Sequence, residues 1–232
     1  AGGDARSALN AVELGILTTE RSADDKIHIT IDVAAECIQK RVMNYDKTGD
    51  NHYDTISAFI KSMRGSDPDA ALYYLAKMLY AGESVEFIAR RIMISAAEDV
   101  GMADPNALTV AVSAANAVHQ IGMPEAKIIL AEAVVYMATA PKSNASYMGL
   151  EKAMSAVQNT KISGIPVHLM DAHYKGAAKL GHGDGYKYAH DYENHYVNQQ
   201  YLPDELVNEV FYNPGDLGYE VKVKEHFKKI KG

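Results

Sequence analysis

The longest stretch of helix-like apolar pattern runs from residue 84 to residue 140. Glycine or proline interrupts it at four places: Gly101, Pro105, Gly122 and Pro124. Glycine commonly follows the last turn of a helix, and proline fits the first turn. We therefore predict three consecutive helices. The last two, at 105–121 and 124–139, are apolar on almost every side, which predicts that other helices or other subunits surround them.

The first 46 residues predict two short helices joined by an extended segment. Asp4 is placed to cap the first helix, whose apolar stripe follows helical spacing: Ala8, Leu9, Val12 and Ile16. The segment KIHITID alternates apolar and polar residues, which predicts a short strand or an extended arm. Asp32 is placed to cap a second helix over VAAECIQKRVMNY. The glycine, aspartate and asparagine residues of DKTGDNHYD then break the pattern and indicate a domain boundary.

Between this boundary and residue 84, the pattern predicts two more helices. TISAFIKSMRG predicts a short amphipathic helix that ends at Gly65. SDPDAALYYLAKMLYAG follows, with Asp67 as the cap, Pro68 in the first turn and Gly82 at the end. After residue 141, SNASYMGLEKAMSAVQN predicts one further helix capped by Ser143 or Ser146. The elements indicate consecutive helical hairpins without a fixed repeat length.

From Gly164 onward the chain is rich in glycine, proline, asparagine, histidine and tyrosine. Only one short helix is predicted here, at 171–180. Eight tyrosines lie between Tyr174 and Tyr219, and each carries a large apolar ring. We therefore predict that this irregular segment lies across the helices rather than extending into solvent.

Composition and charge narrow the class of protein. With 232 residues, of which 47% are hydrophobic, the chain is long enough for a large core. Its one cysteine, Cys37, excludes an internal disulfide and a four-thiolate zinc site. The sequence shows neither a secretory signal nor an uncharged run long enough to span a membrane. We expect a soluble protein of a reducing compartment.

The net charge of −7 argues against a surface devoted to nucleic acid. Acidic residues outnumber basic ones in residues 1–56, in 57–170 and in 171–232. Only the tail VKVKEHFKKIKG, with its lysines from Lys222 to Lys231, is locally basic. We expect DNA binding to be weak and sensitive to salt.

Two sequence segments resemble a known family. The opening GDARSALNAVE, with Gly3, Asp4, Arg6, Leu9, Asn10 and Glu13 at matching positions, resembles the start of the lid domain in clamp-loader-like AAA+ ATPases. The stretch AAEDVGMADPNALTVAVSAANAVHQIGMPEAKIILAEAVVYMATAPKSN resembles the C-terminal region of the bacterial RarA/MgsA replication-associated recombination ATPases. The likeness extends over nearly the whole chain.

This resemblance implies a mainly α fold: a helical AAA+ lid at 1–46, a linker at 47–56 and a helical oligomerisation domain at 57–232 with an irregular Tyr/Gly-rich C-terminal segment. It implies that Arg6 is the sensor-2 residue, which reaches the γ-phosphate of ATP bound by the preceding domain of the parent protein. A forked, permanently charged guanidinium suits a polyphosphate. The alternative is that Arg6 is a solvated residue in a helix's first turn.

The resemblance also implies that this chain is the assembly part of a DNA-dependent ATPase acting at stalled replication forks. The parent is expected to form a homotetramer, to use ATP and magnesium, and to meet DNA and fork proteins such as single-strand-binding protein in the bacterial cytoplasm, associated with the nucleoid. The chain itself has no G-x-x-x-x-G-K-[ST] loop, because GHGDGYK at 181–187 has the wrong spacing. We therefore expect no cofactor and no catalysis in this part.

Four residues leave a metal-dependent hydrolase open as an alternative: His182, His190, Asp191 and His195. Such enzymes need further ligands from separate helices, whereas these residues share one irregular segment, so we expect no metal here. Two charged pairs are interpreted in the same way. Glu98 and Asp99 point about 100° apart on a helix, which indicates a polar helix end rather than an acid pair. For Arg90 and Arg91 we favour pairing of one arginine with Glu86 or Asp99 and solvation of the other over contact with DNA.

Overall fold

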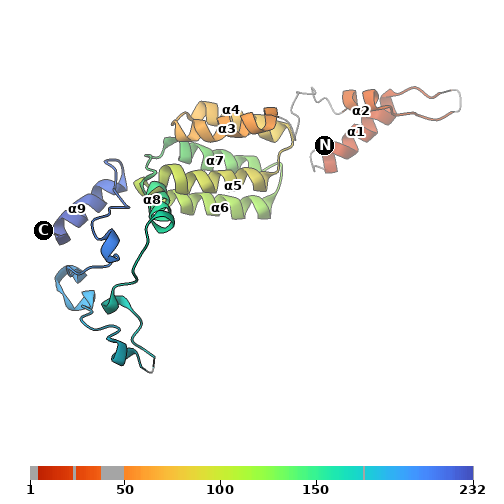
Figure 1. Cartoon of the computed structure of the whole chain (residues 1–232). Helices are drawn as coiled ribbons and strands as arrows, with labels where there is room; N and C mark the ends of the chain where they lie inside the picture. The colour runs from red at the N-terminus through yellow and green to blue at the C-terminus, as the bar shows by residue number, and fades with distance from the viewer. Residues whose placement is uncertain (1–4, 23–24, 38–49, 175, 232) are drawn as a thin grey trace. The chain divides into compact units, whose positions relative to one another are not determined.

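The computed structural model describes residues 5–22, 25–37, 50–174 and 176–231, and these residues form helices and irregular segments without a strand (Figure 1). The predicted mainly α fold class is confirmed. The chain divides into two compact units, residues 1–96 with 107–139 and residues 97–106 with 140–232. None of the described helices is both long enough and apolar enough to cross a bilayer.

Five helices of the first unit form a bundle: α3 (Asp50–Arg64), α4 (Pro68–Tyr80), α5 (Val85–Ser95), α6 (Asn106–Ile121) and α7 (Ala126–Thr139). Helix α7 packs against α3, α4 and α5. Large side chains that are almost completely buried form its core: Phe59, Met63, Met78, Ile88, Ile92, Val118, Leu130, Val134 and Met137. Each contributes about 1.5–3 kcal/mol through burial, which makes this bundle the stable centre of the unit.

Local chemistry sets the helix boundaries in the bundle, as predicted. The Asp67 side chain accepts a hydrogen bond of 2.9 Å from the backbone N–H of Ala70 and caps α4. Ser84 caps α5 by accepting from the N–H of Phe87 at 3.2 Å. Gly82, between the two helices, has the positive φ of 75° expected after a helix end. The three predicted helices of 84–140 are confirmed as α5, α6 and α7.

Helix α5 continues directly into a π-helix, Ala96–Val100, and a 3-10 turn, Gly101–Ala103, both of which belong largely to the second unit. Gly101 has a φ of 50°, and a Cβ there would lie 2.6 Å from the carbonyl oxygen of Ser143. The N–H of Ser143 donates to the carbonyl of Asp99 at 2.9 Å. Glu98 and Asp99 therefore lie in an irregular helix end, consistent with their interpretation as such.

The N-terminal pair consists of α1 (Ala5–Thr18) and α2 (Ile31–Cys37), which pack against each other. The predicted cap of α2 is wrong: Thr30 accepts from the N–H of Val33 at 3.3 Å, and Asp32 lies in the first turn. The arm before α2 is not a strand, and Ile29 lies beside Gly15 of α1. The other predicted cap, Asp4, lies outside the described residues.

The lid, linker and oligomerisation boundaries stay predictions, because most of the region around the predicted linker lies outside the described residues. Helix α3 begins at Asp50, so the helix predicted from Thr55 starts five residues earlier than expected. The predicted apolar stripe of α1 is largely exposed in this chain, with Leu9 and Val12 open to solvent.

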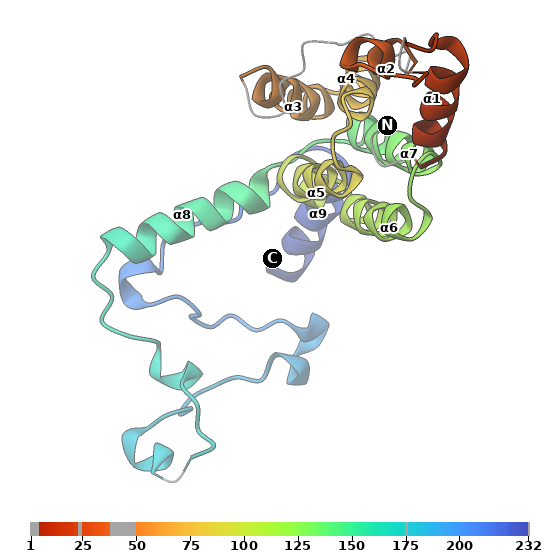
Figure 2. The same cartoon turned by 90° about the vertical axis from the view of Figure 1, so that its right-hand side faces the viewer.

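In the second unit, α8 (Ala145–Asn159) is followed by a long irregular segment and by α9 (Tyr219–Lys231) (Figure 2). The predicted caps of α8, Ser143 or Ser146, are wrong, because Asn144 is the N-cap residue and Ser146 lies in the first turn. The Ser143 hydroxyl still accepts from the N–H of Ala145 at 3.2 Å. Short 3-10 turns interrupt the irregular segment: Val167–Leu169, Ala177–Leu180, Ala189–Asp191, Glu193–His195 and Asp204–Leu206. The helix predicted at 171–180 is therefore wrong except for its last four residues, and α9 was not predicted.

The irregular segment returns to α8 before α9 begins. A Cβ on Gly149 of α8 would lie 2.9 Å from the carbonyl oxygen of Phe211, so only glycine permits this approach. Beyond that contact, the completely buried Glu220 accepts from the Tyr212 hydroxyl at 3.0 Å and from the N–H of Gly215 at 2.7 Å. The prediction that this segment crosses a helix is confirmed for 211–212.

Candidate functional site

Helix α6 is the most unusual surface element of the bundle. Over sixteen residues, NALTVAVSAANAVHQI, it carries no lysine, arginine, aspartate or glutamate. One side is buried in the bundle through small residues and a valine: Ala107, Ala111, Ala114 and Val118. Leu108 and Val112 lie on another side and are exposed. Charge depletion together with exposed apolar groups is typical of the centre of a protein interface.

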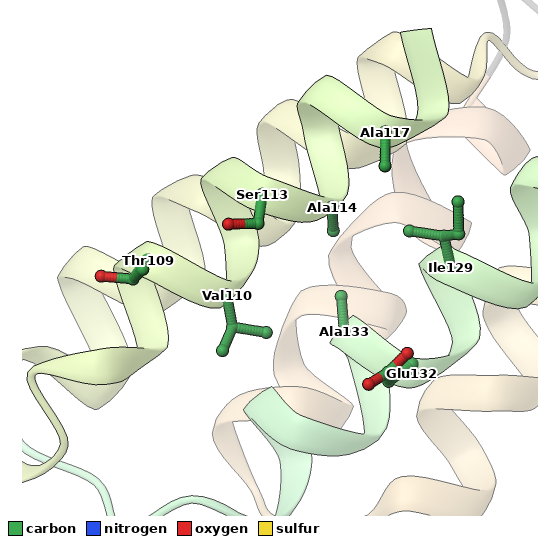
Figure 3. A pocket seen from close by; sticks show the side chains of 8 residues that line it. All are labelled: Thr109, Val110, Ser113, Ala114, Ala117, Ile129, Glu132 and Ala133. Carbon is green, nitrogen blue, oxygen red and sulfur yellow. The ribbon is translucent and has the colours of Figure 1, made fainter. Parts of the chain in front are cut away.

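A groove runs between α6 and α7, with a volume of about 400 Å³ (Figure 3). It is lined by Thr109, Val110, Ser113, Ala114, Ala117, Ile129, Glu132 and Ala133. Most of these side chains are small, and this leaves the space open between the two helices. The groove carries one carboxylate, that of Glu132.

Helix α7 also carries exposed apolar groups. Ile128 and Val135 lie on its solvent side, and Ile121 and Met123 are exposed at the α6–α7 connection. We call α6 and α7 with these groups the α6–α7 face. Its apolar side chains have no partner among the described residues that would remove them from water, so the face is suited to cover by another protein surface.

A local network of charged groups lies at the start of α5. The Ser84 hydroxyl donates to Glu86 at 2.6 Å, and this bond, supported by a backbone hydrogen bond, His119 and Arg90, lowers the pKa of Glu86. The guanidinium carbons of Arg90 and Arg91 lie 5.8 and 5.0 Å from the Phe87 ring centroid. The charge of Arg90 contributes to the lowered pKa of Glu86, whereas the pairing of one arginine with Glu86 or Asp99 stays a prediction. Both arginines contact the Phe87 ring.

Comparison with known proteins gives the same family over both parts of the chain. The family model described as the MgsA AAA+ ATPase C terminal matches residues 65–231, and the AAA C-terminal domain model matches residues 1–64. The chain is 49% identical over 230 residues to Replication-associated recombination protein A of Bacillus subtilis, covering 99% of this chain and 54% of that protein. The chain belongs to the RarA/MgsA family of AAA+ ATPases.

Other relatives also match more than 90% of this chain, while the chain covers 50% of one and 26% of the other. The Escherichia coli Replication-associated recombination protein A is 39% identical over 224 residues, 96% of this chain and 50% of that protein. The ATPase WRNIP1 of Dictyostelium discoideum is 34% identical and matches 91% of this chain. The chain spans about half the length of these bacterial relatives.

The predicted sensor residue of the RarA/MgsA lid, Arg6, is the second residue of α1. Its side chain lies outside what the structure describes, so its role stays a prediction. The position agrees with an arginine presented by the first turn of the lid helix.

The histidine cluster does not form a metal site in the described residues, which contain no group of three or more His, Cys, Asp or Glu side chains placed to hold a metal ion. His182 is paired through Nδ1 with the Tyr174 hydroxyl at 2.9 Å. His190 and His195 contact each other with ring centroids 4.9 Å apart, and His190 also contacts Tyr188. The metal-hydrolase alternative therefore has no support.

The basic tail is the C-terminal part of α9. Lys224 forms an ion pair of 2.6 Å with Asp216, and three lysines lie in the last turn: Lys228, Lys229 and Lys231. Helix α9 thus offers only a short basic surface, and one of its lysines is already paired.

The residues that join α8 and α9 to the segment 211–215 were not predicted from the sequence. Glu220 and Gly149 carried no signal by themselves, because their roles depend on partners at Tyr212, Gly215 and Phe211. For α8, the sequence does contain a signal: its large apolar residues follow a regular helical spacing, which indicates a side of the helix that packs against a partner.

Proposed function

We propose that this chain is the C-terminal assembly part of a RarA/MgsA ATPase acting in replication-associated recombination, and that it holds the parent protein together as a homotetramer. The observation that carries the proposal is the α6–α7 face, with its helix α6 free of Lys, Arg, Asp and Glu and its groove beside α7. We infer that the partner is a second copy of the same chain, because most soluble oligomers are closed, symmetric assemblies of identical subunits.

The mass of the isolated chain tests the proposal. Size-exclusion chromatography with light scattering at micromolar concentration should give four times the 25.3 kDa of one copy. A mass that stays at 25.3 kDa would contradict the homotetramer.

Charge placed on the α6–α7 face tests whether this surface carries the contact. Val112→Glu with Ile128→Glu should lower the mass of the assembly, because burying unpaired carboxylates opposes association. Ala76→Glu, on the exposed side of α4, is the matched control and should leave the mass unchanged. Equal masses for both variants would place the contact elsewhere.

DNA dependence belongs to the parent protein in this proposal. The isolated chain should bind DNA weakly, because its net charge is −7 and its basic surface is confined to the end of α9. Fluorescence anisotropy at low and at physiological salt measures this. Nanomolar binding at physiological salt would contradict the assignment of DNA binding to other parts of the parent.

ATP and magnesium also bind to the parent protein in this proposal, and Arg6 contacts the γ-phosphate there. We propose that the parent acts at stalled replication forks in the bacterial cytoplasm, together with fork proteins such as single-strand-binding protein. Arg6→Ala in the full-length protein should lower ATP turnover ~10²-fold or more, the typical loss for a preorganised charge. Oligomer mass and melting temperature should be nearly unchanged. Unchanged turnover would make Arg6 a structural residue.

A further inference from the structure

Helix α8 has two faces of opposite character. Its small residues Ala145, Gly149 and Ala156 lie on one side by helical spacing, and the backbone at Phe211 closes over Gly149. Gly149 is the one residue of α8 that is buried. Its own chain therefore covers the small-residue side and leaves the other side open.

The open side carries four large apolar residues, which we call the α8 seam: Tyr147, Leu150, Met154 and Val157. Their exposed fractions are 42, 61, 49 and 70%. They are spaced three, four and three residues apart, the a and d positions of two heptads. This spacing suits a second helix packed along the seam, because each side chain then enters a space between four residues of its partner.

The charge around the seam is compatible with an identical partner. Ser146 and Ala153 flank it on one side, and Glu151 and Gln158 on the other. Two copies facing each other thus bring one carboxylate each to the contact, without a row of like charges. Lys152 lies on the side of the helix away from the seam.

The area of the seam indicates a contact that works within a larger assembly. Four half-exposed apolar side chains present roughly 400 Å² per copy, or about 800 Å² for a pair, below the ~1,200 Å² of a stable interface. A pairing of this size needs a second contact to hold it. The α6–α7 face is such a contact.

We propose that α8 pairs with α8 of a second copy of this chain about a two-fold axis, each seam covering the other. The inference rests on the proposed homotetramer and identifies one of its two contacts. The seam joins two copies, and the α6–α7 face joins two such pairs, as expected when each contact is symmetric.

Charged substitutions in the full 232-residue chain test the pairing. Leu150→Glu with Met154→Glu should halve the mass measured by light scattering relative to the unsubstituted chain. The control, Ser155→Glu, lies on the same helix but outside the seam, is exposed, and should keep the full mass. A seam variant that keeps the full mass would overturn the pairing while leaving the homotetramer in place. If the unsubstituted chain is monomeric, both the proposed homotetramer and the proposed pairing are contradicted.

Cysteine cross-linking keeps the test independent of any loss of folding in the charged variants. In a Cys37→Ser background, Leu150→Cys, Met154→Cys and a mixture of the two are oxidised with oxidised glutathione. Linked dimers are expected from the single variants if the helices are parallel, and from the mixture if they are antiparallel. Ser155→Cys should not link. Absence of linked dimers in all three seam samples overturns the pairing.

Discussion

The α3–α7 bundle and the segment 140–232 differ in how they cover their apolar residues. In the bundle, large side chains of all five helices are almost completely buried, among them Phe59, Leu130 and Met137. In 140–232 the buried large apolar side chains are Val197 and Leu206, while α8 and five of the irregular segment's tyrosines remain exposed. The bundle is stabilised by its own core, whereas the other segment depends on single contacts and on surfaces left for a partner.

The same substitution in the two regions gives the largest contrast. Leu130→Ala should lower the free energy of unfolding by about 2–5 kcal/mol, because Leu130 is completely buried in the bundle. Leu150→Ala, at an exposed position of α8, should leave the unfolding of the bundle unchanged. Urea denaturation followed by circular dichroism at low protein concentration measures both. Equal losses would show that the bundle is not stable without α8.

The substitution Gly149→Ala is expected to displace the irregular segment from α8. In Gly149→Ala the new Cβ would lie 2.9 Å from the Phe211 carbonyl oxygen, and one of the two backbones must move. Overpacking of this kind costs about 1–3 kcal/mol. Amide hydrogen exchange should accelerate in 209–217 and remain unchanged in α3–α5. Slow exchange in 209–217 would mean that the segment is held elsewhere.

The Tyr212–Glu220 hydrogen bond gives the second unit an alkaline pH dependence. Burial, together with the bond to Glu220, raises the pKa of Tyr212 from 10.0 to about 12. The folded state therefore keeps the proton to higher pH, so the stabilisation is complete below pH 10 and is lost as pH rises from 10.0 to about 12.

Tyr212→Phe should remove that part of the pH dependence. At neutral pH it should also cost about 1–2 kcal/mol, because the buried Glu220 loses a donor. Hydrogen exchange of the α9 amides at about pH 7 measures the cost of the substitution in both proteins. Urea denaturation at a series of pH values up to about pH 11 measures the pH dependence. Identical pH profiles for the two proteins would contradict the role of Tyr212.

The smallest effect is expected at the Ser84 cap. Ser84→Ala removes the acceptor of the Phe87 N–H and should cost about 1 kcal/mol. The Ser84 hydroxyl also donates to Glu86 and lowers its pKa. In the variant the pKa of Glu86 should rise in an NMR titration, and the loss of stability on acidification through the Glu86 titration should shrink. An unchanged pKa would assign its lowering to the backbone hydrogen bond, His119 and Arg90.

The bundle was predictable from the sequence because its boundary signals are local. Asp67, Ser84 and Gly82 each act within three residues of their own position, so the pattern sufficed to place α4 and α5. The family was likewise recognisable from the sequence, chiefly from the stretch 96–144. The apolar character of α6 and α7 predicted cover by neighbours, but not which of their sides the bundle leaves open.

Helix α9 and the α8 contact were not predictable for the opposite reason. Val221 and Val223 alternate with lysines in a pattern that fits a strand as well as a helix. Glu220 is buried, although a glutamate at this position in the sequence predicts a surface residue. What fixes this part is the set of bonds from Glu220 to Tyr212 and Gly215 and the passage of Phe211 over Gly149. Such pairings depend on three-dimensional proximity, which spacing along the chain does not encode.

The place of α7 in the chain has a consequence for synthesis. Helices α3, α4 and α5 all pack against α7, yet α7 is separated from α5 by the excursion of residues 97–106 into the second unit and by α6. On the ribosome, the first three helices of the bundle emerge well before the helix that completes their core. Until α7 has been synthesised, the sides of α3, α4 and α5 that pack against it stay exposed to water, so the bundle cannot complete its core before residue 139 has emerged.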